Sequence, residues 1–232
     1  MDRKIGILCA GDEELAPFLP LIENRTETRK AMLTIYEGEI SGVPAAVLFS
    51  GVCKVNAAVA AQILIDSYGA QAIINAGTAG ALEESLALFD TVVGTETAYH
   101  DVAGDILTEF HPWMESVWFP SDPGLLAAAE KAAGKLGIPV RFGRMVTGES
   151  FISGGDRERI LAAYHPLTFD MESAAAAHVC YVNRIPFLPI RTVTDTADHG
   201  AAENFERNCR RASEISARLT AALLESLRET ES

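Results

Sequence analysis

Short apolar runs alternate along this chain with longer stretches in which apolar and polar residues recur at helical spacing. The apolar runs predict strands at "KIGILCA" (4–10), "AAVLFS" (45–50), "QAIINAG" (71–77), "TVVGTETAY" (91–99), "VRFGRMVTG" (140–148) and "FLPIRTVTD" (187–195). Several of these runs lack a polar residue at every second position. That pattern is typical of strands that are buried on both faces of a sheet.

The stretches between the apolar runs are rich in alanine and predict helices. They span approximately 54–68, 123–136, 155–164, 171–183 and 203–228. The alternation of strand and helix indicates an α/β fold with a mostly parallel sheet. One segment departs from this rule, because "LTIYEGEISGVPAAVLF" has the pattern of a hairpin with Ser41 and Gly42 at its turn. The sheet is therefore predicted to be mixed.

Length and composition restrict the class of protein. A chain of 232 residues that is 48% hydrophobic fits one compact domain over residues 1–232. The formal net charge of −13 repels nucleic acid and anionic membranes, so neither is expected as a partner. The first apolar run is too short for a signal peptide, which favours a cytoplasmic location. The scattered cysteines and histidines have no metal-ligand spacing, so we expect no disulfide, metal or cofactor.

Candidate functional residues follow the predicted strands. In a parallel α/β sheet, ligands bind outside the carboxyl ends of the strands, where several loops converge. Five strand ends carry candidates, namely Glu14, Thr78 in "NAGTAG", the pair Phe151 and Ile152, the pair Met171 and Glu172, and the pair Thr194 and Asp195.

Two of the candidate acids also have simpler interpretations. Glu14 follows Asp12 and Glu13 at a predicted helix start, where the helix dipole favours acids of any role. Asp195 follows a strand, where an aspartate commonly caps a helix or an Asx turn. The local sequence leaves both interpretations open.

Glu172 is harder to explain as a surface acid. It lies between Met171 and a run of small residues, in a place that should pack tightly. An unpaired carboxylate there would cost several kcal/mol or would have a raised pKa, so it needs hydrogen-bond donors such as ligand hydroxyls. Asp170 lies on the other side of Met171, and strand alternation directs it away from that residue and out of any catalytic pair with Glu172.

Seven motifs occur in order over nearly the whole chain: "KIGILCAGDEEL", "SGVCKVNAA", "INAGTAGAL", "YHDV", "TGESFI", "DMESAAAAHV" and "RTVTD". With these motifs the sequence resembles the nucleoside phosphorylase and nucleosidase superfamily, most closely its 5′-methylthioadenosine/S-adenosylhomocysteine nucleosidases. The resemblance implies a nucleoside phosphorylase-like fold, which is a three-layer α/β/α sandwich around a mixed, twisted sheet. It also implies a homodimer and a small-molecule nucleoside as the substrate.

The resemblance further implies a hydrolase that releases adenine from 5′-methylthioadenosine or S-adenosylhomocysteine. Glu14 would activate the attacking water, and Asp195, assisted by Thr194, would protonate the purine. Glu172 would bind the ribose hydroxyls. Phe151 would stack on the base, and the Ile152 backbone would recognise the adenine edge. The remaining substrate-binding positions are Val52, Thr78, Met171 and Phe205.

Three other functions remain open from the sequence. A futalosine or aminodeoxyfutalosine hydrolase would use the same acids on a different 5′ group. A purine nucleoside phosphorylase would need cations for phosphate, but Glu14 and Asn75 occupy those positions, which favours water as the nucleophile. A non-catalytic nucleoside-binding protein is disfavoured, because binding alone would not require both Glu14 and Asp195.

The sequence departs from the family pattern at several places. Gly11 stands where these nucleosidases commonly have methionine, and Cys53 where they often have glycine. Thr78 and Thr194 replace the more usual serines and keep a hydroxyl. The largest departure is region 100–123, which reads as an irregular loop and leaves the preferred 5′ group open. We expect an apolar wall on the 5′ side from Trp113, Met114, Trp118 and Phe119.

Overall fold

The computed structural model describes residues 3–110, 114–152, 155–196 and 201–230. Its strands are β1 (Ile5–Cys9), β2 (Glu23–Lys30), β3 (Leu33–Ile40), β4 (Val43–Phe49), β5 (Ala72–Ala81), β6 (Thr91–Tyr99), β7 (Phe119–Pro120), β8 (Val140–Thr147), β9 (Thr168–Asp170) and β10 (Phe187–Thr196). Its helices are α1 (Asp12–Leu15), a 3-10 turn (Leu19–Leu21), α2 (Lys54–Tyr68), α3 (Gly104–Glu109), α4 (Pro123–Leu136), α5 (Gly155–Tyr164), α6 (Ser173–Asn183) and α7 (Ala201–Thr230).

The strands form one mixed sheet in the order β10-β6-β8-β9-β5-β1-β4-β3-β2, with β7 paired to β6. At its centre, β1 runs parallel to β4 and β5, and β5 runs parallel to β10. Strands β3 and β4 pair antiparallel, and Ser41 and Gly42 lie at their turn with positive φ. The predicted hairpin and the mixed sheet are therefore confirmed.

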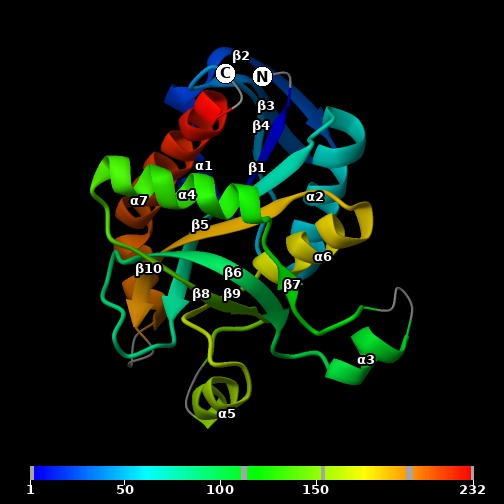
Figure 1. Ribbon diagram of the computed structural model, residues 1–232, viewed down its shortest axis with the longest axis vertical. Coiled ribbons are helices and arrows are strands. Elements are labelled where there is room, and N and C mark those ends of the chain that lie inside the picture. The colour runs from blue at the N-terminus through cyan, green and yellow to red at the C-terminus, as the bar shows by residue number, and fades with distance from the viewer. Residues whose placement is uncertain (1–2, 111–113, 153–154, 197–200, 231–232) are drawn as a thin grey trace.

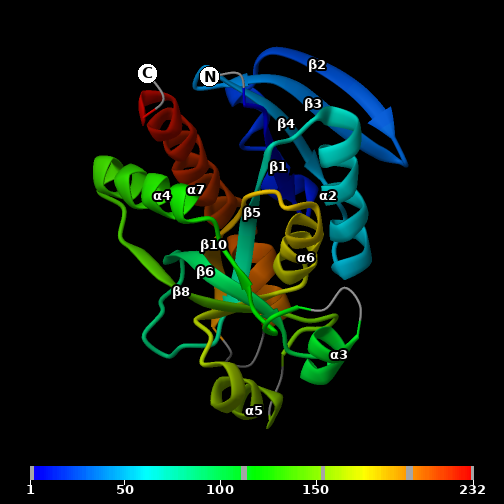
Figure 2. The same ribbon diagram turned by 45° about the vertical axis from the view of Figure 1, so that its right-hand side comes forward.

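Helices cover both faces of the sheet, as Figures 1 and 2 show for α4 and α7 on one side and α2 and α6 on the other. Ile5 and Ile7 of β1 pack with α4 and α7, whereas Leu8 packs with α2 and α6. Alternate residues of one strand thus enter two separate apolar layers. This arrangement explains the continuous apolar runs and confirms the three-layer α/β/α sandwich.

The structure also corrects several sequence predictions. Strand β2 was not predicted, because its sequence "ENRTETRK" is polar and every residue in it is exposed at the sheet edge. Region 100–123 is not an irregular loop throughout, since it contains α3 and β7. Helix α6 begins at Ser173 rather than at 171, with Glu172 as its N-cap residue, and the Asp170 carboxylate accepts the Ser173 N–H at 3.0 Å.

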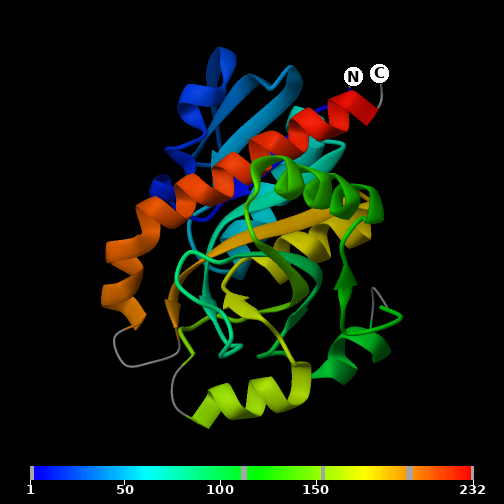
Figure 3. The ribbon, with the colours of Figure 1, turned by 60° about the vertical axis from the view of Figure 1, so that its left-hand side comes forward.

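The 30 residues of α7 form a long helix that crosses one face of the molecule (Figure 3). Its buried residues Ala217, Leu219 and Leu223 lie in the same apolar layer as β1. The N-terminal end of this helix lies near the C-terminal end of β10. None of the described helices is both long enough and apolar enough to cross a membrane.

Candidate active site

A cavity of about 500 Å³ lies at the carboxyl ends of β1, β5, β9 and β10. Nine of the ten predicted site residues line it: Glu14, Val52, Thr78, Phe151, Met171, Glu172, Thr194, Asp195 and Phe205. The tenth, Ile152, is buried in an apolar cluster with Phe169, which itself lines the cavity. Segments far apart in the sequence therefore meet where the sheet topology predicts a ligand site.

Glu14 is the buried acid of helix α1, whereas Asp12 and Glu13 are exposed. One oxygen of its carboxylate accepts the Ala10 N–H at 2.6 Å. The other accepts the backbone N–H of Thr78 at 2.7 Å and its hydroxyl at 2.8 Å. The helix-dipole interpretation thus fits the two exposed acids but does not account for the buried and fixed position of Glu14.

The close approach of Glu14 to strand β5 requires glycine at position 77. A Cβ atom added to Gly77 would lie 2.5 Å from the Glu14 carboxyl carbon and oxygens. Any larger residue would displace the carboxylate from Thr78. The glycine in "INAGTAG" therefore makes room for an acid from another segment rather than for a tight turn.

Asp195 reaches the cavity from a local irregularity of β10. The register between β10 and β5 shifts between Val193 and Asp195, so Thr194 is an extra residue at this point. The Thr194 hydroxyl donates to Asp195 Oδ1 at 2.8 Å, while Oδ2 is buried and has no hydrogen-bond partner among the described residues. Burial raises the pKa of Asp195, and the Thr194 hydrogen bond opposes that rise.

Glu172 is buried between the start of α2 and the centre of the site. The Cys53 N–H donates to its Oε1 at 2.9 Å, and the Arg191 guanidinium lies 3.6 Å from its Oε2. Burial is the main cause that raises the pKa of Glu172 to about 7, and Asp170 and Glu14 add to it against the opposing effect of Arg191. The carboxylate therefore titrates near neutral pH.

Arg191 was not predicted as a site residue, yet it is fully buried at the centre of three acids. Its Nε lies 2.9 Å from Asp170, and its other nitrogens lie 3.6 Å from Glu172 and 3.9 Å from Glu14. Burial disfavours its charge, but the three carboxylates outweigh that effect and hold its pKa above the usual value. A lone arginine inside the apolar run "FLPIRTVTD" is the sequence signal that could have identified it.

Asp170 forms an ion pair with this arginine. The sequence likewise predicted that Asp170 does not form a catalytic pair with Glu172. Besides Arg191, its carboxylate accepts the Thr147 hydroxyl at 2.6 Å and the hydroxyl of Ser173. Asn75, which the sequence placed near the nucleophile, instead accepts from Arg191 at 2.6 Å. Asn75 is completely buried and faces this network rather than the cavity.

The model of the phosphorylase superfamily matches residues 4–225 of this chain. The chain belongs to the phosphorylase superfamily. A 5′-methylthioadenosine/S-adenosylhomocysteine nucleosidase of Actinobacillus succinogenes is 37% identical over 207 residues, which cover 88% of this chain and 90% of that protein. Because the two sequences are this similar over most of their length, the chain also belongs to the 5′-methylthioadenosine/S-adenosylhomocysteine nucleosidase family, as the motifs predicted.

Solved structures of superfamily members agree with the fold. A 5′-methylthioadenosine/S-adenosylhomocysteine nucleosidase of Neisseria meningitidis, in complex with methylthio-immucillin-A, superimposes with a TM-score of 0.91 at 32% identity. The similarity covers 97% of this chain and 99% of that chain. A futalosine hydrolase of Helicobacter pylori superimposes with a TM-score of 0.89 at 25% identity and covers 97% and 98% of the two chains.

The three described residues of the predicted apolar wall on the 5′ side lie away from the cavity of this chain, and a wall formed across a dimer stays a prediction. Met114 and Phe119 are buried in the layer between the sheet and α6, and Trp118 packs against Arg144 with 4.5 Å between the guanidinium and the ring centre. None of these three side chains lines the cavity. Trp113 lies outside the described residues.

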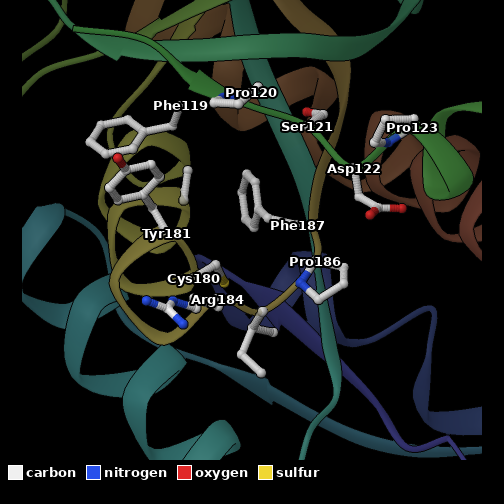
Figure 4. A pocket seen from close by; sticks show the side chains of 12 residues that line it. Phe119, Pro120, Ser121, Asp122, Pro123, Cys180, Tyr181, Arg184, Pro186 and Phe187 are labelled. Carbon is white, nitrogen blue, oxygen red and sulfur yellow. The ribbon is translucent and has the colours of Figure 1, made fainter. Parts of the chain in front are cut away.

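A second cavity, of about 400 Å³, lies near the opposite end of β10 and is shown in Figure 4. Phe119, Tyr181 and Phe187 line it. None of the ten predicted site residues does. Its acid, Asp122, already accepts the Leu125 N–H at 2.9 Å at the start of α4. Of these two cavities, the one around Glu14, Glu172 and Asp195 therefore holds the candidate chemistry.

Proposed function

We propose that this protein is a hydrolase that cleaves the N-ribosidic bond of 5′-methylthioadenosine, S-adenosylhomocysteine or both. The products would be adenine and the 5′-thioribose sugar. The observation that carries the proposal is the contrast between two acids of one cavity. Glu14 accepts three hydrogen bonds, whereas Asp195 has a buried oxygen without a partner among the described residues. Environments that differ in this way separate a general base from a general acid.

The proposed roles follow from the charges that develop during the reaction. Breaking the bond places positive charge on the ribose and negative charge on the purine, as in glycoside hydrolysis. Asp195 would donate its proton to the purine through Oδ2, while Thr194 holds the other oxygen. Glu14 would orient and deprotonate water. Glu172 would bind the ribose hydroxyls, and its hydrogen bonds would strengthen as the ring becomes positive.

Water is favoured over phosphate as the nucleophile because of the charge of the cavity. The described lining residues include no lysine or arginine, whereas seven of them are acids: Asp12, Glu13, Glu14, Asp170, Glu172, Asp195 and Glu206. The nearby cation Arg191 is already surrounded by three carboxylates. A phosphate dianion would therefore meet net repulsion.

A direct assay tests the proposal and separates it from its alternatives. Purified protein would be incubated with methylthioadenosine, S-adenosylhomocysteine, inosine and aminodeoxyfutalosine, each with and without phosphate. We expect free adenine and free sugar from the first two substrates at a rate that does not depend on phosphate. A sugar 1-phosphate product would instead indicate a phosphorylase. Exclusive cleavage of aminodeoxyfutalosine would assign the futalosine-type reaction that the Helicobacter pylori neighbour is named for.

We also propose that the protein is one domain and forms a homodimer through the side that carries α2 and α3. One sheet runs through the described chain, which supports a single domain. Apolar side chains are exposed on α2 at Val55 and Val59 and near α3 at Ile106 and Phe110. Val52 extends this surface to the edge of the cavity, so a second copy there would also cover the 5′ side.

A cytoplasmic location is proposed as well. All four cysteines, Cys9, Cys53, Cys180 and Cys209, are free thiols. Free thiols without disulfides suit a reducing compartment. Fractionation of cells that express the tagged protein would test the location, and recovery in a secreted or membrane fraction would contradict it.

A further inference from the structure

Three charged residues outside the cavity connect the start of α2 to the ends of β6 and β8. We refer to Lys54, Asp101 and Glu149 as the Lys54 cluster. The Lys54 ammonium lies 2.9 Å from both carboxylate oxygens of Asp101 and 4.0 Å from Glu149 Oε1. It also lies 5.3 Å from the centre of the Tyr99 ring. None of these residues lines the cavity, and the proposed reaction does not use them.

The cluster fixes backbone segments as well as side chains. Asp101 Oδ2 accepts the backbone N–H of Glu149 at 3.0 Å. Glu149 Oε1 accepts the backbone N–H of Lys54 at 3.0 Å. Each carboxylate therefore interacts with a backbone N–H and with the ammonium, and the loop after β8 is held against the first turn of α2. Without the ammonium, the two acids would repel each other across this contact.

On one side, the cluster holds the loop that contacts the proposed base position. Glu149 precedes Phe151 by two residues, and Phe151 lines the cavity with half of its surface exposed. The Phe151 ring faces the Phe205 ring of α7 with 6.5 Å between ring centres. Because Phe151 has little packing of its own, its position depends on the backbone that Glu149 anchors.

On the other side, the cluster holds the donor to the ribose carboxylate. The Cys53 N–H, which donates to Glu172, comes from a residue with φ 82° and ψ 162°. This backbone region is essentially restricted to glycine, so a cysteine there must be held by its surroundings. The next backbone N–H, that of Lys54, donates to the Glu149 carboxylate at 3.0 Å, so Glu149 anchors the chain directly after Cys53.

We propose that Lys54 is a positioning residue for the nucleoside site, because it holds Glu149 between the loop of Phe151 and the strained Cys53 that orients Glu172. This inference rests on the proposed function, because it takes Phe151 as the contact to the base and Glu172 as the contact to the ribose. Lys54 acts on binding, whereas Glu14 and Asp195 keep their own hydrogen bonds without it.

The test compares Lys54→Met with the wild type on methylthioadenosine. We expect kcat/KM to fall between about 10- and 10²-fold, mainly through a higher KM, because misplaced binding groups weaken substrate binding without removing the reacting acids. Lys54→Arg should recover most of the loss, since it restores the cation. Lys131→Met is the matched control, because Lys131 also pairs with a glutamate, at 3.0 Å from Glu229, but joins α4 to α7 rather than α2 to the loop after β8.

A double variant separates positioning from a general loss of stability. If Lys54 acts through the loop, the loss in the double variant Lys54→Met/Phe151→Ala will be smaller than the product of the two single losses. A loss equal to that product, or an unchanged KM in Lys54→Met, would overturn the proposal. Should Lys54→Met fail to fold, Asp101→Asn weakens the same cluster at a surface position and replaces it in the comparison.

Amide hydrogen exchange keeps this inference distinguishable from the proposed function. The Glu149 amide, which donates to Asp101, should exchange faster in Lys54→Met than in the wild type and in Lys131→Met. This measurement requires no substrate. A wild type without nucleosidase activity would refute the proposed function, while unchanged exchange at Glu149 would refute the cluster by itself.

Discussion

Two carboxylates of the same cavity have opposite surroundings at the residue scale. Glu14 is held in place by hydrogen bonds from the Ala10 N–H and from the Thr78 N–H and hydroxyl. Asp195 has one buried oxygen without a hydrogen-bond partner among the described residues, and its pKa is raised by burial. This difference, rather than the presence of two acids, supports separate roles for them in the reaction.

Removal of either acid should abolish most of the activity. We expect Asp195→Asn and Glu14→Gln each to reduce kcat/KM by about 10²- to 10⁴-fold, the usual contribution of a general acid or base. Steady-state assays with methylthioadenosine measure the change, and circular dichroism checks the fold. Glu130→Gln is the control, because Glu130 is an exposed acid of α4 that does not line the cavity. Activity near the wild-type level in either variant would exclude that acid from the mechanism.

Glu172 should make the stability of the free protein depend on pH. Its pKa is raised from 4.5 to about 7 in the folded state, so the folded state binds its proton more tightly than the unfolded chain does. The resulting stabilisation is fully present below pH 4.5 and is lost as the pH rises through about 7. We therefore expect Glu172→Gln to flatten the fall in the free energy of unfolding over this interval. Denaturant titrations at several pH values test this, and an unchanged slope would contradict it.

Arg191 joins three strands and a helix at the element scale. From β10 it contacts Asp170 at the end of β9, Asn75 of β5 and Ser173 at the start of α6. The acids that surround it would repel one another without its charge. This ion network therefore holds the carboxyl ends of the central strands together.

Substitution of Arg191 should be strongly destabilising. We expect Arg191→Met to lower the free energy of unfolding by about 3–5 kcal/mol, because it leaves buried carboxylates without a counter-charge. The matched variant Arg210→Met removes an arginine whose side chain is 88% exposed, and it should cost no more than about 1 kcal/mol. Urea unfolding, which we expect to be a single transition for one domain, measures both. Equal effects of the two substitutions would contradict the proposed role of the buried arginine.

At the scale of the whole molecule, the exposed apolar side chains of α2 and α3 bear on assembly. Val55 is 72% exposed, and an isolated chain would present it with Val59, Ile106 and Phe110 to water. The Lys54 cluster lies beside this surface, at the first turn of α2. The proposed dimer interface and the residues that position the substrate site are thus proposed to lie at the same end of this helix.

A charge on this surface should prevent dimer formation. We expect Val55→Asp to shift the protein from dimer to monomer in size-exclusion chromatography with light scattering, because a carboxylate would be buried without a partner. Met32→Asp is the control, since Met32 is a fully exposed apolar residue at the turn between β2 and β3. A wild type that elutes as a monomer at micromolar concentration would contradict the proposed dimer.

The sequence by itself determined the layered α/β fold and nine residues that line the cavity, of which Val52 and Phe205 came from the family resemblance and the other seven from the strand ends. Buried strands such as β1 and β5 produce continuous apolar runs, and ligand sites form at their carboxyl ends, so local pattern and topology were sufficient for the fold and for the strand-end residues. Polar β2 gave no such signal, because its pairing at the sheet edge depends on β3 and not on its own composition.

Only the tertiary structure decided how the charges of the site are balanced. Glu14, Asp170 and Glu172 lie far from Arg191 in sequence or on other elements, and their ion pairs exist only where β1, β5, β9 and β10 converge. The strained Cys53 and the Lys54 cluster likewise depend on contacts between distant segments. Local sequence determines which residue types are present, but the distance and burial that set their pKa values arise from the packing of the whole chain.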